Sequence, residues 1–363
     1  MQPKNKILFI LKTPPPYGGG EIMHQYLYDY YKSKDNILIL TLSSSRRNKS
    51  NQGLFQMWKI FETLKFMLTF FRLNFKEKPK IIYFSVGKSF SALLRDSINI
   101  IIPNLLGQKV ILELHGSSFP FMDEPVKHII GKKILEKSFL IRVLSNSIKK
   151  ELNNYGIQNT FVLENGIKIF NSKQPKKSNL QFLFVGTLSK EKGFENLIRS
   201  LIAIQKSSGR ILNLICLGEW KSEEFKKIII GLIHQHDLQS SVEFLGPIIN
   251  EKKWDIYAQS DVLILPSLSE GQPLVLLEAL GMGLVIIATD VGGISDTLKN
   301  SRNLLIQPGN QDDLTNSIQN ILVWDVKTIR KIQEENKQIF LTRFTLEKYL
   351  KATEKLLNDI IVK

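Results

Sequence analysis

Short runs of apolar residues recur along the chain, and longer stretches with helical spacing separate most of them. Such runs are typical of strands buried on both faces of a parallel sheet, because the connecting helices cover both sides. The predicted strands lie at residues 6–11, 37–42, 81–85, 110–114, 139–144, 161–163, 182–185, 211–217, 242–245, 261–265, 284–288 and 304–306. This alternation of strand and helix predicts an α/β fold with parallel sheets.

A polar segment without periodicity interrupts the pattern at residues 171–179. It has the composition of a linker, and a strand, a glycine turn and a helix restart after it. A chain of 363 residues is long for one domain. We therefore expect an N-terminal domain at residues 1–170, a C-terminal domain at residues 180–340 and a final helical segment at residues 341–363.

Residues 267–293 are the most informative part of the chain. A buried strand leads into a polar loop with Glu270, Pro273 suits the first turn of the following helix, and Glu278 lies about one and a half turns inside it. Both carboxylates can face one pocket over the helix N-terminus, where free N–H groups favour a phosphate. Carboxylates accept hydrogen bonds from sugar hydroxyls, so the arrangement predicts a phosphorylated, polyhydroxylated ligand. The alternative is two unrelated solvated glutamates.

A glycine-rich turn also follows the first predicted strand. Residues 13–21 contain three prolines and three glycines, and a predicted helix begins behind them. Such a backbone can approach a ligand closely. A glycine cluster alone is equally consistent with a simple turn.

The spacing Glu270-x7-Glu278 between two apolar strands, followed by the sequence Thr-Asp-Val-Gly-Gly at residues 289–293, resembles the donor-site signature of retaining glycosyltransferases of family 4. This family, also called glycosyltransferase group 1, has the GT-B fold. The resemblance implies two Rossmann-like domains with parallel sheets facing across a cleft. The first would bind the acceptor, the second would bind a nucleotide-sugar, and the terminal helix would cross back to the first domain.

The resemblance also implies roles for particular residues. Glu270, His115 and Lys192 are the expected catalytic residues: Glu270 and His115 would contact the donor sugar, and Lys192 would stabilise the leaving diphosphate. Glu278 would hold the ribose hydroxyls. The full set expected at the nucleotide-sugar is Gly19, Gly20, Gly186, Lys192, Gly271, Gln272, Pro273, Leu274, Val275 and Glu278.

Two positions depart from the family pattern. Thr187 stands where an arginine that grips the diphosphate is usual, which removes one cation that Lys190 could replace. Lys168 stands where an aspartate is usual after Asn165 and Gly166. No Asp-x-Asp sequence occurs, so neither a metal ion at the diphosphate nor another cofactor is indicated.

The net charge of +15 is concentrated in the first half of the chain. Residues 1–172 hold 25 Lys or Arg against 12 Asp or Glu, whereas residues 173–363 hold 24 against 22. A basic domain attracts nucleic acid, anionic lipid or an anionic substrate, and no nucleic-acid-binding motif is visible. The charge therefore favours an anionic acceptor. We expect this acceptor to be a polyprenyl-diphosphate-linked glycan, as used in the assembly of bacterial surface polysaccharides.

The expected location is the cytoplasm, with peripheral contact to anionic lipid on the inner face of the plasma membrane. The single cysteine, Cys216, excludes a disulfide within the chain and fits a reducing compartment. No apolar run approaches the roughly 18 residues that a membrane-spanning helix needs. The Phe-rich stretch at residues 54–73 is favoured as a core helix, and its alternative is a face for a membrane surface.

The sequence is also compatible with other functions. An inverting GT-B transferase or a nucleotide-sugar epimerase would need a base in the first domain, for which the candidates are His24, His115 and His128. A non-catalytic scaffold of the same fold is a further alternative because of Thr187.

Overall fold

The computed structural model of the chain describes residues 5–42, 52–87, 90–116, 125–170, 180–249 and 251–362. The chain divides into two compact units. The first consists of residues 1–115, 119–163 and 350–363, and the second of residues 116–118 and 164–349. The domain boundaries expected at residues 170 and 341 remain predictions, and the expected linker at residues 171–179 lies outside the described residues.

In the described part of the first unit, six parallel strands form a sheet with the order β2-β1-β3-β4-β5-β6. The strands are β1 (Ile7–Leu11), β2 (Ile37–Thr41), β3 (Ile81–Ser85), β4 (Lys109–Glu113), β5 (Leu140–Val143) and β6 (Thr160–Val162). The helices are α1 (Gly19–Tyr31), α2 (Gln52–Glu77), α3 (Phe90–Leu105), α4 (Pro125–Lys137), α5 (Asn146–Asn154) and, from residue 350 onward, α13 (Leu346–Val362).

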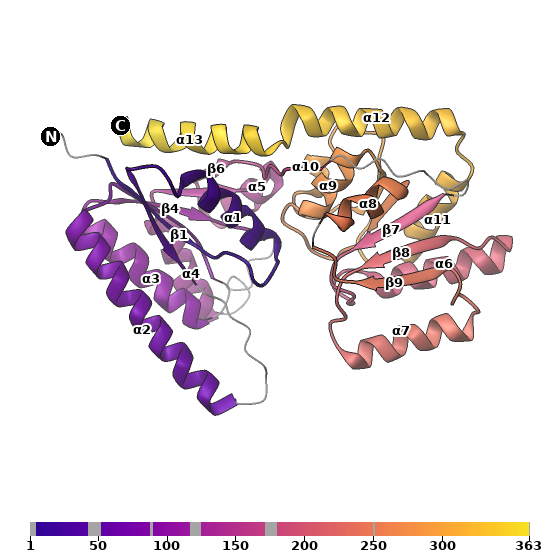
Figure 1. Cartoon of the computed structure of the whole chain (residues 1–363), viewed down its shortest axis with the longest axis horizontal. Coiled ribbons are helices and arrows are strands. Elements are labelled where there is room, and N and C mark those ends of the chain that lie inside the picture. Colours follow the sequence, from indigo (N-terminus) through magenta and orange to yellow (C-terminus); the bar gives the residue numbers. More distant parts are fainter. Residues whose placement is uncertain are drawn as a thin grey trace. The chain divides into compact units, whose positions relative to one another are not determined.

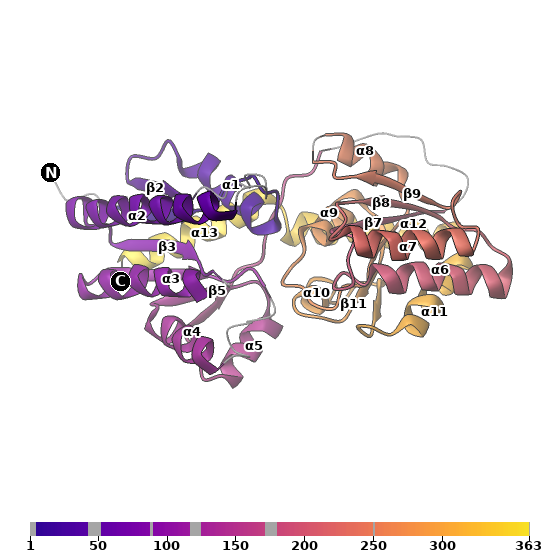
Figure 2. The same ribbon diagram turned by 90° about the horizontal axis from the view of Figure 1, so that it is seen from below.

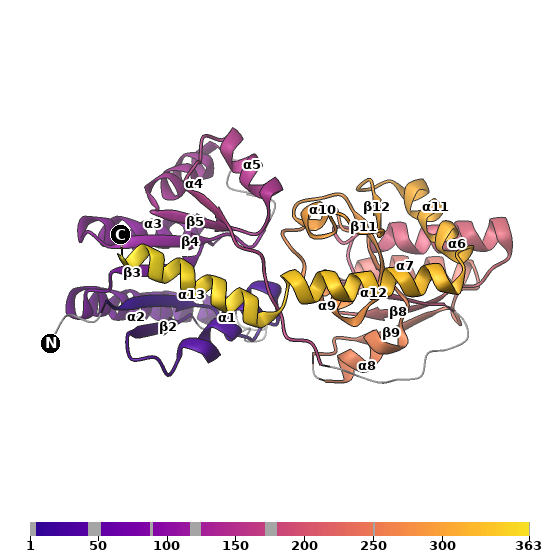
Figure 3. The ribbon, with the colours of Figure 1, turned by 90° about the horizontal axis from the view of Figure 1, so that it is seen from above.

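Helices cover both faces of this sheet, as apolar strands require. Side chains of α2, α3, α4 and α5, such as Phe70, join one core cluster with Leu8 and Ile82 of the strands. On the other face the ring of Tyr31 in α1 stacks on Phe9 with centroids 4.8 Å apart. The helices α1 and α13 thus lie on the face opposite to α2 and α3 (Figures 2 and 3).

The second unit repeats this plan, and its described residues contain a parallel sheet with the order β12-β11-β10-β7-β8-β9. The strands are β7 (Gln181–Val185), β8 (Asn213–Leu217), β9 (Val242–Gly246), β10 (Val262–Leu265), β11 (Val285–Thr289) and β12 (Leu304–Ile306). The helices are α6 (Phe194–Ser208), α7 (Glu223–Gln235), α8 (Lys252–Gln259), α9 (Leu274–Met282), α10 (Ile294–Thr297), α11 (Gln311–Leu322) and α12 (Val326–Arg343).

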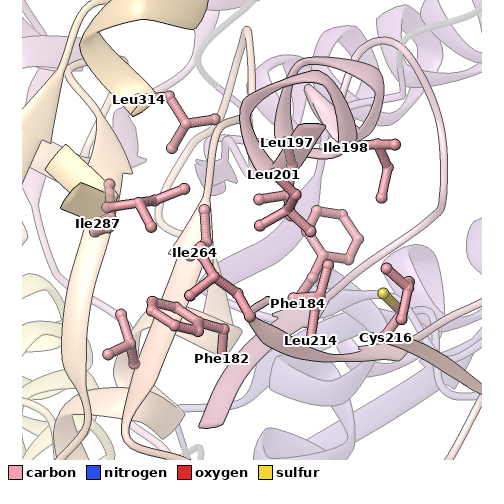
Figure 4. Close-up of a cluster of buried hydrophobic side chains, with 14 of the residues drawn as sticks. Phe182, Phe184, Leu197, Ile198, Leu201, Leu214, Cys216, Ile264, Ile287 and Leu314 are labelled. Carbon is pink, nitrogen blue, oxygen red and sulfur yellow. The ribbon is translucent and has the colours of Figure 1, made fainter. Parts of the chain in front are cut away.

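The main core of the second unit lies between its sheet and the helices α6, α7 and α11. Figure 4 shows Phe182, Leu214 and Ile264 of the strands pointing toward Leu201 of α6. Cys216 lies in the same cluster, and its burial raises the pKa of its thiol well above the ordinary value. The helices α8, α9 and α12 cover the opposite face of the sheet (Figure 1).

The predicted α/β fold with two parallel sheets is confirmed. The Phe-rich stretch predicted as a helix is α2, and its Phe66 and Phe70 are buried in the core. The helix after Glu270 begins one residue later than predicted, because Pro273 keeps an extended backbone as the N-cap of α9. Among the described residues, no helix combines the length and apolar character that a membrane crossing would need.

Candidate active site

Two loops at the carboxyl ends of adjacent strands pack against each other in the second unit. One follows β7 and the other follows β10. The amide of Leu268 donates a hydrogen bond of 2.8 Å to the carbonyl of Glu191. Gly193 has a φ of +66°, and a β-carbon there would lie 1.9 Å from the carbonyl oxygen of Pro266. Only glycine therefore allows the two loops to approach this closely.

This contact brings together two of the predicted catalytic residues. The Lys192 ammonium donates a hydrogen bond of 2.6 Å to Oε1 of Glu270. The Lys192 side chain is 31% exposed and that of Glu270 is 11% exposed. The carboxylate is therefore largely fixed, while the ammonium remains accessible to a ligand with negative charge.

Glu278 lies in the fifth position of α9, and α8 supplies two donors to its carboxylate. Lys253 donates to Oε1 at 2.7 Å, and the hydroxyl of the buried Tyr257 donates to Oε2 at 2.7 Å. Burial, together with the charge of Glu278, raises the pKa of Tyr257 well above its ordinary value, so the hydroxyl stays a donor. A carboxylate oxygen has further lone pairs, so both oxygens can also accept from a ligand hydroxyl.

The sequence interpretation missed Lys253 and Tyr257. They lie four residues apart, which places them on one side of a helix. That spacing was the available signal, but it does not say which neighbour the side meets.

The residues expected between the two glutamates have different environments. The carbonyl of Gly271 accepts from the amide of Gly293 at 2.6 Å. The Gln272 side chain is buried: its Oε1 accepts from the amide of Asn165 at 2.6 Å, and its Nε2 donates to Thr297 at 3.2 Å. Gln272 thus ties the loop to the protein interior, and its side chain is not directed toward a ligand.

The N-terminus of α9 has the backbone features of an anion-binding site. Its N-cap is Pro273, and within the described part of the chain no side chain caps this end of the helix. The first amides of a helix have no partner inside the helix, so those of Leu274 and Val275 offer donors for an anion.

Gly186 directly follows β7, and it lies beside a second glycine, Gly218, which directly follows β8. The amide of Gly186 donates to the carbonyl of Leu217 at 2.9 Å. A β-carbon on Gly218 would lie 1.9 Å from the carbonyl oxygen of Gly186. The two strand ends therefore meet without side chains at this edge of the sheet. Thr187 and Lys190, on the following loop, are both exposed.

In the first unit, the glycine-rich turn meets the predicted His115. Gly19 and Gly20 open α1, and a β-carbon on Gly20 would lie 3.1 Å from Cδ2 of the His115 ring. The His115 side chain is 20% exposed. A side chain at position 20 would press against this ring, so Gly20 and His115 form one small group at the carboxyl edge of the sheet.

A buried charged network lies beside His115. Glu113, at the end of β4, forms an ion pair with the fully buried Arg142 of β5. His115 Nε2 lies 3.4 Å from Glu113 Oε1, and His24 Nε2 lies 3.2 Å from Oε2. The sequence interpretation missed Glu113 and Arg142, and the available signal was a charged residue in each of two otherwise apolar strands.

His24 does not fit the role of a base for a substrate. Its Nδ1 accepts from the amide of Lys12 at 2.8 Å, so Nε2 carries the proton that faces Glu113. Burial lowers the pKa of His24 well below 6.5, which keeps the ring neutral. This arrangement disfavours the alternatives of an inverting transferase or an epimerase that would use His24 as base.

The same network has the spacing of a metal site. Ligand atoms of His24, Glu113 and His115 lie within 4.8 Å of one another. However, the protonated Nε2 of His24 has no lone pair for a metal, and Arg142 already balances the charge of Glu113. The chemistry of these donors therefore does not fit a metal ion.

Residues 167–339 match the family model of glycosyl transferases group 1. A proposed teichuronic acid biosynthesis glycosyltransferase of Bacillus subtilis, TuaC, is 25% identical over 225 residues, which cover 57% of this chain and 54% of that protein. This chain thus aligns with about half the length of TuaC. An uncharacterized glycosyltransferase of Methanocaldococcus jannaschii is 26% identical over 356 residues, 95% of this chain and 96% of the relative.

Solved structures show the same fold. Sucrose-phosphate synthase from Thermosynechococcus elongatus matches 99% of both chains with a TM-score of 0.77 and 18% identity. Anabaena HepE, solved in complex with UDP-glucose, matches 98% of this chain and 99% of its own with a TM-score of 0.75 and 18% identity. These likenesses confirm the GT-B fold, and the match over residues 167–339 assigns this part of the chain to the group 1 glycosyltransferases.

Proposed function

We propose that the enzyme transfers a sugar from a UDP-sugar to a glycan or lipid-linked glycan, with retention of configuration at the anomeric carbon. The observation that carries the proposal is the pair of fixed carboxylates on either side of the α9 N-terminus. Glu270 is held by Lys192, and Glu278 is held by Lys253 and Tyr257.

The donor would occupy the second unit at this helix end. Its diphosphate accepts hydrogen bonds from the amides of Leu274 and Val275 and from Lys192. Glu278 accepts from the ribose hydroxyls and Glu270 from the sugar hydroxyls. Solved Anabaena HepE contains UDP and UDP-glucose, which supports uridine as the nucleotide. We further propose that His115 contacts the donor sugar and that Gly19 and Gly20 contact the diphosphate.

In the proposed reaction the bond between the anomeric carbon and the diphosphate oxygen breaks, and the acceptor hydroxyl oxygen bonds to that carbon on the same face. The proton of the acceptor hydroxyl moves to the departing phosphate. Charge grows on the diphosphate as the bond breaks, so the cation of Lys192 stabilises the transition state more than the ground state. Neither glutamate needs to act as a nucleophile.

The acceptor proposal rests on charge. The first half of the chain holds almost all of the positive excess, which favours an anionic acceptor such as a polyprenyl-diphosphate-linked glycan. Similarity to the teichuronic acid biosynthesis protein supports a role in assembly of a bacterial surface polysaccharide. Such an acceptor would place the enzyme in the cytoplasm, at the inner face of the membrane.

A thermal-shift panel with UDP, GDP, ADP, CMP and dTDP tests the donor site. UDP at about 100 times its dissociation constant should stabilise the wild type by about 2.7 kcal/mol. The shift should vanish in Glu278→Ala and persist in Glu224→Ala, an exposed residue of α7. A shift with another nucleotide would replace uridine in the proposal. The absence of any shift would favour the scaffold alternative, in which Thr187 has removed the grip on the diphosphate.

A further inference from the structure

The helices α2 and α3 carry apolar side chains on their outer sides, where water-facing helices normally carry polar ones. On α2 the exposed side chains are 57–71% exposed and recur at helical spacing: Phe61, Leu64, Leu68 and Phe75. On α3 a second stripe is 39–80% exposed: Leu94, Ile98, Ile101 and Leu105. Residues three, four and seven apart share one side of a helix, so each set is a continuous stripe.

Packing against the sheet does not explain these stripes. Each helix has a separate inner stripe that joins the core, with Phe66 and Phe70 on α2 and Leu93 and Ile100 on α3. The two helices run alongside each other on the same face of the sheet (Figures 1 and 2). The exposed stripes therefore lie on neighbouring helices and face away from the sheet. We call this surface, made of the eight exposed residues, the outer apolar surface.

The charges around the outer apolar surface indicate its partner. Residues 52–106 contain eight Lys or Arg and three Asp or Glu. Lys65, Arg72 and Lys76 are exposed on α2 itself. Two copies of such a basic face repel each other, whereas a surface of anionic lipid attracts it, by about 1 kcal/mol for each cation near the lipid.

We propose that α2 and α3 form the surface by which the first unit binds the interface of a bilayer that contains anionic lipid. The apolar stripes enter the boundary between headgroups and acyl chains, and the cations contact the headgroups. The inference rests on the proposed function only for the membrane location of the acceptor.

This binding mode would also orient the first unit. Helices that connect parallel strands run back along the sheet, so the N-terminal ends of α2 and α3 lie at the carboxyl edge of the strands. The same edge carries His115, which follows β4. A unit that rests on α2 and α3 would hold this edge beside the bilayer, within reach of a lipid-linked acceptor.

Sedimentation of the full chain with vesicles tests the proposal. The vesicles are phosphatidylcholine alone, or an equimolar mixture of phosphatidylcholine and phosphatidylglycerol. We expect binding to the mixed vesicles that weakens with salt. Leu68→Gln with Leu105→Gln should weaken it at least about tenfold, and Lys65→Gln with Arg72→Gln about fivefold for each cation. The matched control is Ile211→Gln with Val323→Gln, which changes exposed apolar residues of the second unit and should bind like the wild type.

Equal binding to both kinds of vesicle, or unchanged binding by the Leu68 and Leu105 variant, would overturn the proposal. A wild type that self-associates, with a monomeric Leu68 and Leu105 variant, would overturn it in favour of a second copy of the chain. The UDP thermal shift is measured on the same variants and should be retained. Absence of the UDP shift in the wild type would count against the proposed function. The vesicle result tests the membrane-binding surface independently of that shift.

Discussion

Replacing Gly193 by alanine should loosen the packing of the two loops that hold Lys192 and Glu270. A φ of +66° costs an L-residue about 1–2 kcal/mol, and the loss of freedom in the unfolded chain returns about 0.4–1 kcal/mol. The new β-carbon would also lie 1.9 Å from the backbone oxygen of Pro266. A backbone oxygen cannot rotate away, so the loop itself must shift, which adds about 1–3 kcal/mol, as overpacking does.

Gly209 provides a matched control, because it has nearly the same backbone conformation without the collision. Its φ is +64°, and a β-carbon there meets no described atom within 4 Å. Gly209→Ala therefore carries the conformational cost alone, about 1.6 kcal/mol or less after the unfolded-state gain. The difference between the two variants isolates the contact with Pro266.

Urea denaturation of both variants, followed by circular dichroism, measures this difference, and calorimetry with UDP measures the effect on the site. We expect Gly193→Ala to lose about 1–3 kcal/mol more stability than Gly209→Ala and to bind UDP more weakly, since Lys192 precedes the shifted residue. Equal denaturation midpoints for the two variants would refute the reasoning that this contact positions the loop.

Three further predictions concern single side chains. Tyr257→Phe removes a donor to a buried carboxylate and should cost about 1.5–3 kcal/mol in urea denaturation, but less in a Glu278→Gln background; equal losses would contradict the coupling. Lys192→Met should lower kcat about 10²–10³-fold, whereas Lys190→Met should stay near the wild type; equal effects of the two would argue against a specific role of Lys192. Burial lowers the pKa of His24 below 6.5. The neutral ring therefore contributes its full stabilisation above about pH 6.5, and the free energy of unfolding falls as the pH drops below that value, by up to about 1.4 kcal/mol per pH unit. His24→Gln should therefore lose less stability than the wild type between about pH 7 and 5, as measured by the midpoints of urea denaturation. An unchanged dependence of these midpoints on pH would show that another group titrates.

The positions of Glu270 and Glu278 along the chain could be predicted because they depend on local order. A buried strand, a polar loop, a proline and an apolar helix follow one another in the sequence, and the structure has β10, the loop and α9 in that order. The roles of the two glutamates in binding and catalysis remain predictions.

The partners of these residues could not be predicted, because they depend on which helix faces meet after folding. Lys253 and Tyr257 reach Glu278 across 25 and 21 residues of the chain. Glu113 and Arg142 meet because β4 and β5 are neighbours in the sheet. A sequence pattern marks such residues as polar within apolar segments, and the register of neighbouring elements decides their contacts.

The Phe-rich helix shows a similar limit. Its pattern predicted a core helix and left a membrane face as the alternative, and the structure shows one buried stripe and one exposed stripe on α2. Periodicity alone cannot divide apolar residues between two sides when both sides are apolar. The sequence pattern of α3 predicts only a connecting helix, and its exposed stripe becomes visible in the structure.

The buried Cys216 makes the chain a natural reporter of its own local opening. It is the single cysteine of the protein, it lies in the core of the second unit, and burial raises the pKa of its thiol. A thiol reagent reacts with the accessible thiolate, so Cys216 can be modified only after this core opens. The labelling rate would therefore follow the opening of one unit without any engineered probe. Protection by UDP would then measure, in the native state, how strongly donor binding is coupled to the stability of that unit.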